Sequence, residues 1–221
     1  KMKKTVAVIP IKLCNTRLPG KNIKILGDKA LCKYLFDTVQ CVDVIDEIYV
    51  YCSDESLKDY MPEGIRFLKR SKELDSDSIK SKDILESFIN EVDADIYALL
   101  HVTQPFITAE TIKSSILKVR EEDYDSAFAA FPIREFAWYD GSPINYCLTD
   151  VIRTQELKPV YVEGELYVFE KNVFTEKGRR IGDKPWIQEI EWKENICIDD
   201  IHDFEMAEAV IALERKNERC K

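Results

Sequence analysis

Short apolar runs alternate along the first half of the chain with segments in which apolar side chains recur every three or four residues. The runs have the length and the β-branched or aromatic content of strands, whereas the spacing of the other segments is that of amphipathic helices. The predicted strands are residues 6–10, 47–52, 65–68, 95–100 and 124–131, and the predicted helices are residues 31–39, 84–92 and 112–119. This order predicts an α/β domain with a mostly parallel central sheet between two layers of helices.

The pattern changes after the fifth predicted strand. Residues 134–158 are aromatic and rich in turn formers and have no clear period, so we expect residues 132–163 to project as an insertion. Alternation returns at residues 161–169, where Gly164 would suit a bulged strand. Residues 195–199 alternate as a last strand, and the acidic run that follows favours the start of a helix over residues 204–213.

Length and charge narrow the class of protein. A chain of 221 residues with 45% hydrophobic and 33% charged residues suits one globular domain with a buried core, so we expect a single domain over residues 1–221. The formal net charge of −9 argues against a nucleic-acid partner and against an anionic membrane surface. The basic residues are therefore expected to serve a small anion.

The sequence favours a reducing compartment. Its seven cysteines are odd in number and form no C-x-x-C pair, and two histidines are too few for a His-based metal site. No apolar run approaches the roughly 18 residues of a spanning helix, and the basic N-terminal residues lead into a strand rather than a signal-peptide core. We therefore expect a cytoplasmic protein without a membrane partner.

The loop after the first predicted strand carries the first candidate chemistry. Lys12, Arg17 and Lys21 lie within ten residues, bounded by Pro19 and Gly20. Cations and backbone N–H groups at the carboxyl edge of a sheet can converge on a polyanion such as a triphosphate. The loop lacks the glycine pattern of a P-loop, so a solvated basic loop is an equally good interpretation of the spacing alone.

This segment resembles the N-terminal signature of the CMP-sialic acid synthetase family, the acylneuraminate and related nonulosonate cytidylyltransferases. The family signature reads Ile-Pro-Ala-Arg-x-Gly-Ser-Lys-x-x-Pro-x-Lys-Asn, and the residues retained here are Ile9, Pro10, Pro19, Lys21 and Asn22. Lys12 replaces the arginine, and Arg17 stands one position after the family's first lysine. The resemblance extends, with further matches, from about Thr5 to Glu208.

The resemblance implies both a fold and a reaction. The fold is a three-layer, Rossmann-like nucleotidyltransferase fold whose insertion forms a homodimer. The reaction transfers CMP from CTP to an acidic, nonulosonate-type sugar with Mg²⁺ and releases pyrophosphate, in the synthesis of precursors of cell-surface glycans. Such a reaction needs cations and a metal ion that stabilise charge on phosphate oxygens. It does not need a covalent intermediate.

Residue roles follow from the same resemblance. The catalytic, phosphate-binding residues would be Lys12, Arg17 and Lys21, and the nucleotide-binding residues would be Leu13, Asn15, Asn22, Arg70 and Ser81. The acceptor-binding residues would be His101, Gln104, Arg153, Gln155, Glu163 and Tyr167. Asp199 would bind the metal, while the family's preceding aspartate is replaced by Cys197. His101 could serve as a general base or as a hydrogen-bonding wall of the pocket, and the residue type does not decide between the two.

Departures from the family pattern leave other interpretations open. A non-catalytic nucleotide-binding paralogue would explain the lost arginine and aspartate, and an enzyme that uses another nucleotide would share the fold. Glu163 and Glu165 stand where the family has neutral residues, which predicts an acceptor other than an ordinary sialic acid because nearby like charges repel. The pattern fits equally well two glutamates that alternate with Gly164 and face solvent. A phosphorylated or phosphonate acceptor could supply metal ligands that the protein lacks at Cys197.

Overall fold

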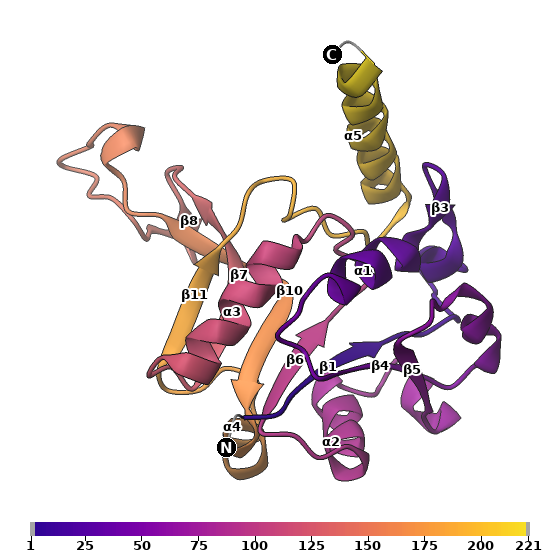
Figure 1. Ribbon diagram of the computed structural model, residues 1–221. Helices are drawn as coiled ribbons and strands as arrows, with labels where there is room; N and C mark the ends of the chain where they lie inside the picture. The colour runs from indigo at the N-terminus through magenta and orange to yellow at the C-terminus, as the bar shows by residue number, and fades with distance from the viewer. Residues whose placement is uncertain (1–2, 220–221) are drawn as a thin grey trace.

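A seven-stranded sheet forms the centre of the computed structural model, which describes residues 3–219 (Figure 1). The strands lie in the order β11-β7-β10-β6-β1-β4-β5. Their bounds are β1 Thr5–Pro10, β4 Glu47–Cys52, β5 Ile65–Lys69, β6 Ile96–Leu100, β7 Ser126–Ile133, β10 Val160–Glu170 and β11 Pro185–Glu189. Within this sheet β10 runs antiparallel to both neighbours while the other pairings are parallel, which confirms the predicted mostly parallel α/β sheet.

Helices cover both faces of the sheet because its strands are apolar on both sides. Ala7 and Ile9 of β1 pack in the same cluster as α1 (Leu31–Gln40) and α3 (Ala109–Glu121). Val6 and Val8, which point to the opposite face, pack with α2 (Ser81–Glu91) and α4 (Lys171–Lys177). Alternate residues of one strand thus anchor two helical layers.

The C-terminal helix α5 (Ile201–Arg219) stands to one side of these layers (Figure 1). Phe204 and Ile211 of α5 are buried against Leu26 and Leu31, close to the start of α1. Asp200 caps the helix by accepting hydrogen bonds from the backbone N–H groups of His202 and Asp203. The acidic run therefore opens the helix as predicted.

Parallel pairing brings several loops to one edge of the sheet. Ile9 of β1 is in register with Val50 of β4, so the basic loop after Pro10 and the turn at Ser53–Asp54 share the carboxyl edge. Strand β6 is parallel to β1 and ends beside them at Leu100. Open α/β sheets bind their ligands at this edge.

The insertion between β7 and β10 projects away from the sheet (Figure 1). It contains the short hairpin β8 (Trp138–Tyr139) and β9 (Ser142–Pro143) and the 3-10 turn η4 (Thr154–Glu156). Trp138 and Tyr139 are 53% and 76% exposed. The segment between β7 and β10 thus presents exposed aromatic side chains, and its role in forming a dimer stays a prediction.

Strand β10 is bulged where the sequence analysis expected it. Its register with β7 shifts between Glu163 and Tyr167, and Gly164 lies inside that interval. The backbone of Gly164 passes close to Gln104, whose amide nitrogen would lie 3.0 Å from an added Cβ atom. A residue without a side chain lets the two segments approach.

Three expectations about elements need correction. Residues 195–199 begin in a turn and form no strand, although Ile196 and Ile198 are buried as the alternation predicted. The predicted helices are longer than expected, most of all α5. The sequence analysis did not identify α4 or β11, which occupy the polar segment after β10.

The cysteines that the structure describes are free thiols, in agreement with the expectation from their number. They are Cys14, Cys32, Cys41, Cys52, Cys147 and Cys197, while Cys220 lies outside the described residues. None of the helices within residues 3–219 has the length and hydropathy required to cross a bilayer.

Candidate active site

A cavity of about 420 Å³ opens at the carboxyl edge of β1 and β6. Its floor is apolar and includes Val8 and Leu99 from these two strands. Polar groups on its wall come from four segments distant in sequence. The predicted site residues among them are Lys12, Arg17, Arg70, Ser81 and His101. An apolar floor with convergent cations suits a nucleotide, since the base needs a flat apolar surface and the phosphates need positive charge.

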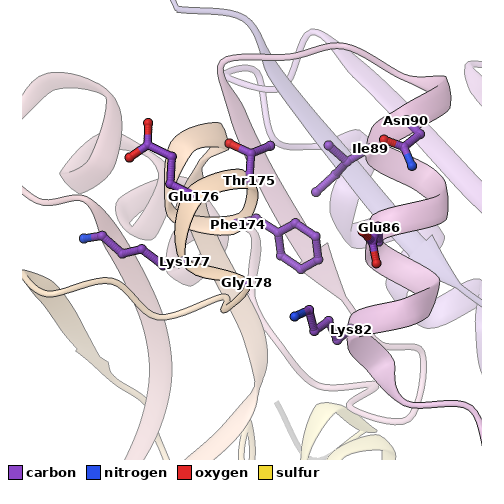
Figure 2. A pocket seen from close by; sticks show the side chains of 9 residues that line it. All are labelled: Lys82, Glu86, Ile89, Asn90, Phe174, Thr175, Glu176, Lys177 and Gly178. Carbon is purple, nitrogen blue, oxygen red and sulfur yellow. The ribbon is translucent and has the colours of Figure 1, made fainter.

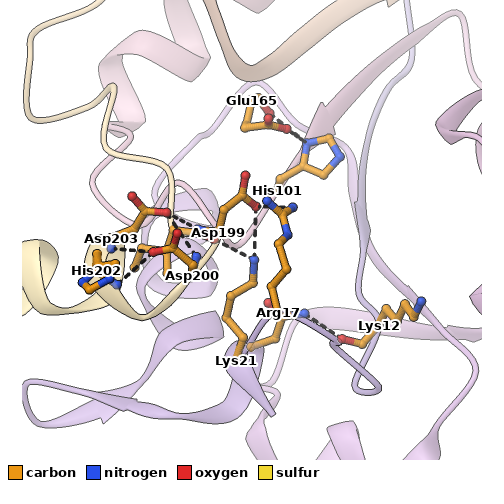
Figure 3. A network of polar contacts seen from close by, with 11 residues as sticks. Lys12, Arg17, Lys21, His101, Glu165, Asp199, Asp200, His202 and Asp203 are labelled. Carbon is orange, nitrogen blue, oxygen red and sulfur yellow. Dashed lines mark hydrogen bonds and ion pairs between the residues drawn. The ribbon is translucent and has the colours of Figure 1, made fainter. Parts of the chain in front are cut away.

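Asp199 lies between two cations of the basic loop (Figure 3). Its Oδ1 atom is 3.0 Å from Arg17 Nη2 and 3.4 Å from Lys21 Nζ. Lys21 is buried and also donates a 2.6 Å hydrogen bond to the carbonyl of Ile198. These contacts tie the segment 195–199 to the basic loop, so the predicted metal ligand and two predicted phosphate ligands form one cluster.

The remaining cations of the cavity are also paired with carboxylates. Lys12 Nζ lies 2.7 Å from Asp77 Oδ1, and this hydrogen bond raises the pKa of Lys12 above its ordinary value. Arg70 is buried and its Nη2 atom is 2.5 Å from Asp75 Oδ1. An incoming triphosphate therefore competes with protein carboxylates, most easily at Lys12, because Asp77 is largely exposed.

The other predicted nucleotide ligands differ in what they contact. Asn22 is buried and donates a 2.7 Å hydrogen bond to the carbonyl of Lys12, so its amide supports the loop. Asn15 borders a small cavity beside Asp199, and its buried Oδ1 atom has no hydrogen-bond partner among the described residues. Leu13 packs against the core. Ser81 begins α2 at the cavity wall.

His101 and Glu165 form a pair above the cavity (Figure 3). The Nδ1 atom of His101 lies 3.0 Å from Glu165 Oε2 and 3.1 Å from the Glu165 carbonyl oxygen. Two acceptors at Nδ1 favour the tautomer that carries its proton there, which leaves Nε2 as a proton acceptor. This arrangement of base and orienting carboxylate is the one that general-base catalysis requires.

Gln104 is buried beneath the same pair rather than open to the cavity. Its Nε2 atom donates to the carbonyl of Glu194 at 2.5 Å, and its Oε1 atom accepts from the backbone N–H of Glu165 at 2.9 Å. The amide thus positions Glu165, and direct contact of Gln104 with an acceptor stays a prediction.

Tyr167 and Glu163 lie on the bulged part of β10. The Tyr167 hydroxyl donates to Glu163 Oε2 at 2.9 Å, and burial raises the pKa of this phenol well above its usual value. The hydroxyl therefore stays protonated at neutral pH and remains a donor. Their role towards an acceptor stays a prediction.

Arg153 and Gln155 do not join this cluster within one chain. Both lie in the projecting insertion, where the exposed Arg153 pairs with Glu156 in the same turn. Their predicted role in binding the acceptor stays a prediction. Any contact of theirs with an acceptor requires a second copy.

Cys197 is a partly buried thiol whose environment does not suit a metal ligand. Burial raises its pKa to about 11, so the neutral form dominates at neutral pH. Among residues 3–219 no three His, Cys, Asp or Glu side chains are grouped to hold a metal ion. Asp199 alone fits a Mg²⁺ that arrives with nucleotide phosphates, because Mg²⁺ commonly uses one or two carboxylates with phosphate oxygens and water.

Several contributors were not identified from the sequence. Asp75 and Asp77 lie in the polar segment before α2, and their hydroxyl-rich surroundings gave no sign that each pairs with a cation of the site. Arg180 contacts the Tyr167 ring from the segment after α4, for which no element was predicted. Only tertiary structure brings these residues to the predicted site residues that they contact.

Comparison with solved structures shows a shared fold. A CMP:2-keto-3-deoxy-manno-octonic acid synthetase complexed with CTP has a TM-score of 0.72 at 18% identity, covering 96% of this chain and 99% of that chain. A 4-diphosphocytidyl-2C-methyl-D-erythritol synthase from Anaerococcus prevotii has a TM-score of 0.67 at 16% identity, covering 95% and 96%. The predicted nucleotidyltransferase fold is thereby confirmed.

Two sequence relatives are 3-deoxy-manno-octulosonate cytidylyltransferases. The 3-deoxy-manno-octulosonate cytidylyltransferase 2 of Hydrogenovibrio crunogenus is 24% identical over 57% of this chain and 50% of its own length. The 3-deoxy-manno-octulosonate cytidylyltransferase of Leptospira interrogans serovar Lai is 25% identical over 75% and 65%. The chain thus spans about half to two thirds of these relatives.

The family-wide comparison covers nearly the whole chain. The model of a family described as cytidylyltransferase matches residues 6–216. These findings support the wider family and do not single out its sialic acid branch. The chain belongs to the cytidylyltransferase family.

Proposed function

We propose that this protein transfers CMP from CTP to an acidic sugar of the 3-deoxy-2-keto acid type and releases pyrophosphate. The observation that carries the proposal is the convergence of Lys12, Arg17 and Lys21 with Asp199 beside an apolar cavity. The names of the sequence relatives add the acceptor class. Nonulosonate-type sugars share the same carboxylate and hydroxyl chemistry and belong to the same proposal.

In this mechanism the acceptor hydroxyl attacks the α-phosphorus of CTP, and the bond to the β-phosphate oxygen breaks. Lys12 and Arg17 exchange their carboxylate partners for phosphate oxygens and stabilise the charge that develops on the leaving pyrophosphate. Nε2 of His101 accepts the proton of the hydroxyl, and Glu165 stabilises the resulting imidazolium. Arg70 and Ser81 line the nucleoside part of the cavity.

Mg²⁺ is the metal that this chemistry calls for. When bound, it supplies positive charge to the phosphates of CTP. Asp199 would hold it, and the chain's own task is to present that carboxylate once Arg17 has turned to the nucleotide. The protein is proposed to act in the cytoplasm, where CTP is available, as a homodimer.

A phosphorylated or phosphonate acceptor is the second candidate. It is favoured by Cys197, which offers a neutral thiol where a second carboxylate would help to bind metal. An acceptor that brings its own phosphate could supply that ligand. A nucleotide-binding protein without turnover is the third outcome of the same test.

The test is release of pyrophosphate by the purified protein with Mg²⁺ and each of the four nucleoside triphosphates. The acceptor panel contains 3-deoxy-manno-octulosonate, N-acetylneuraminate, a polyol phosphate and no acceptor. We expect release with CTP and the octulosonate, and slower release with N-acetylneuraminate. Preference for the polyol phosphate would support the second candidate, and CTP binding without release would support the third.

A pair of arginine variants sharpens this test. Arg17→Gln removes an exposed cation from the site and should raise the KM for CTP about tenfold or more. Arg66→Gln removes a comparably exposed arginine from β5 that pairs with Glu47, away from the cavity, and should leave it unchanged. Equal KM values for both variants would contradict the assignment of the phosphate site.

A further inference from the structure

Arg180 is a half-buried arginine without a counter-ion. Its guanidinium carbon lies 3.8 Å from the centre of the Tyr167 ring, in the range of a cation–π contact. Within the part of the chain that the structure describes, Arg180 makes no hydrogen bond and no ion pair. A stacked guanidinium keeps the N–H donors at its edge available. This side chain can therefore donate two parallel hydrogen bonds to one anion.

The cavity beside Arg180 adjoins the nucleotide cavity. It measures about 240 Å³, and Ser81 and Leu85 line both spaces. Leu85 and Phe174 make part of its wall apolar. Lys82 of α2 lies opposite Phe174 and Gly178 at the end of α4, as Figure 2 shows. A ligand in this cavity would therefore lie next to a bound nucleotide, where an acceptor must be.

Arg180 has no counter-ion among the described residues that face this cavity. The Lys82 side chain likewise forms no hydrogen bond or ion pair with any of the described residues, but the carboxylates Glu86 and Glu176 line the space on its other side. Other carboxylates of neighbouring segments have partners: Glu163 accepts a hydrogen bond from Tyr167, Glu165 contacts His101, and Asp183 pairs with Lys177 and Arg179. Arg180 is thus left for a ligand that carries negative charge.

We propose that Arg180 binds the carboxylate of the sugar acid acceptor in this cavity and thereby determines specificity for acidic sugars, an inference that rests on the proposed function. Glu163 and Glu165 would otherwise repel such an acceptor. A guanidinium that is fixed by the Tyr167 ring and next to an apolar wall binds a carboxylate in a bidentate manner at low cost in side-chain entropy. Lys82 adds positive charge from α2.

The primary test compares Arg180→Gln with Arg179→Gln. Arg179 is the neighbouring cation but already pairs with Asp183, so it is a matched control for loss of charge. For Arg180→Gln we expect the acceptor KM to rise about 10- to 100-fold while the KM for CTP stays within about twofold. Equal effects of both variants, or an equal loss of CTP binding in Arg180→Gln, would overturn the proposal.

A carboxamide analogue of the sugar acid gives a second readout. Wild-type protein should bind it as weakly as the Arg180→Gln variant binds the acid, and the variant should not distinguish acid from amide. Calorimetry with CTP present and Ca²⁺ in place of Mg²⁺ measures this binding without turnover. A wild-type protein that binds the acid no better than the amide refutes the role of Arg180 whatever its activity, whereas binding without pyrophosphate release refutes only the proposed function.

Discussion

Asp199 has two roles, and its position in the sequence indicates only one of them. Its carboxylate holds Arg17 and Lys21 in place, and it is also the proposed ligand of Mg²⁺. The first task is structural in the free protein, and the second needs the cations to move to the nucleotide. Removal of the negative charge should therefore affect turnover more than CTP binding.

We predict that Asp199→Asn lowers kcat by about 100-fold or more, because the metal loses its protein carboxylate. The side chain is 47% exposed, so the free energy of unfolding should change by less than about 1 kcal/mol. Steady-state kinetics with a Mg²⁺ titration and urea unfolding measure both quantities. Glu205→Gln, which removes an exposed carboxylate from α5, is the control. Near-normal turnover of Asp199→Asn would remove Asp199 from the metal site.

The cysteines should differ in their rate of alkylation at pH 8, according to how deeply each is buried. Burial raises the pKa of Cys32 and of Cys197 to about 11, which leaves about 0.1% thiolate at this pH. Hydrogen bonds with Thr149 instead lower the pKa of the exposed Cys147. We expect mass spectrometry to find Cys147 labelled within minutes and Cys197 protected.

Labelling of Cys197 should increase as the pH rises towards 11. Over the same interval the protein should lose stability, because unfolded thiols ionise near pH 9 before the buried ones do. Fast labelling of Cys197 at pH 8 would show that its surroundings are open. A Cys197 that labels only after addition of urea would agree with the structure.

Sequence reasoning identified most residues of the site by type but not always by role. The basic loop could be predicted because its cations are close in sequence and follow a strand end. Asn22 matches the family signature and Gln104 stands in a predicted acceptor motif, yet their amides bind backbone groups of neighbouring loops. Arg180 could not be found, since its contact with Tyr167 follows only from how the chain returns after α4.

At the scale of elements, the bulge of β10 links the sheet to the site. An added Cβ at Gly164 would lie 3.0 Å from Gln104 Nε2 and 3.4 Å from Ile190 Cδ1. We predict that Gly164→Ala costs about 1–3 kcal/mol of unfolding free energy through overpacking, measured by urea denaturation. The shifted Gln104 amide should also disturb the backbone of Glu165 and lower kcat.

A double-mutant cycle isolates the cause of that loss. In a Gln104→Ala background the Gly164→Ala substitution should cost clearly less, because the closest contact is gone. An unchanged cost in that background would assign the effect to Ile190 or to the backbone of β10 instead.

The strands and helices that the sequence predicted well are those with strong patterns. Strand β4 was predicted with its observed bounds because an apolar run ends there at a turn. The segment with α4 and β11 was missed because β11 is an edge strand of mixed polarity, PWIQE. Residues 195–199 alternate like a strand, but Asn195 and Ile196 donate to carbonyls of the preceding turn, and Ile198 N–H donates to the distant Thr103 carbonyl at 2.7 Å without forming a strand pairing. Alternation reports burial on one side and does not by itself supply a pairing partner.

At the scale of the whole molecule, the projecting insertion exposes apolar side chains that no part of the same chain covers among the described residues. Phe136, Trp138 and Tyr139 expose large apolar surfaces there, and Arg153 and Gln155 lie beyond reach of their own site. We predict a homodimer in which the insertion of each copy meets the other. Sedimentation at micromolar concentration should give twice the mass of 25.7 kDa.

The doubly substituted Trp138→Ser, Tyr139→Ser protein should be monomeric, because exposed aromatic residues commonly carry interface energy. Substitution of the exposed Trp192 with serine is the matched control and should leave the dimer intact. A wild-type monomer at that concentration would contradict the prediction and would exclude Arg153 from the acceptor site.

The contact between the basic loop and Asp199 also bears on biosynthesis. The Arg17–Asp199 pair joins residues 182 positions apart, and the strand that separates β6 from β7 is the late-synthesised β10. A ribosome that adds about 5–20 residues per second exposes the N-terminal cations many seconds before their partner. The edges of β6 and β7 lack the strand between them until residues 160–170 have been made, and Arg17 and Lys21 lack their carboxylate until Asp199 has been made, so the sheet is completed before the cation cluster.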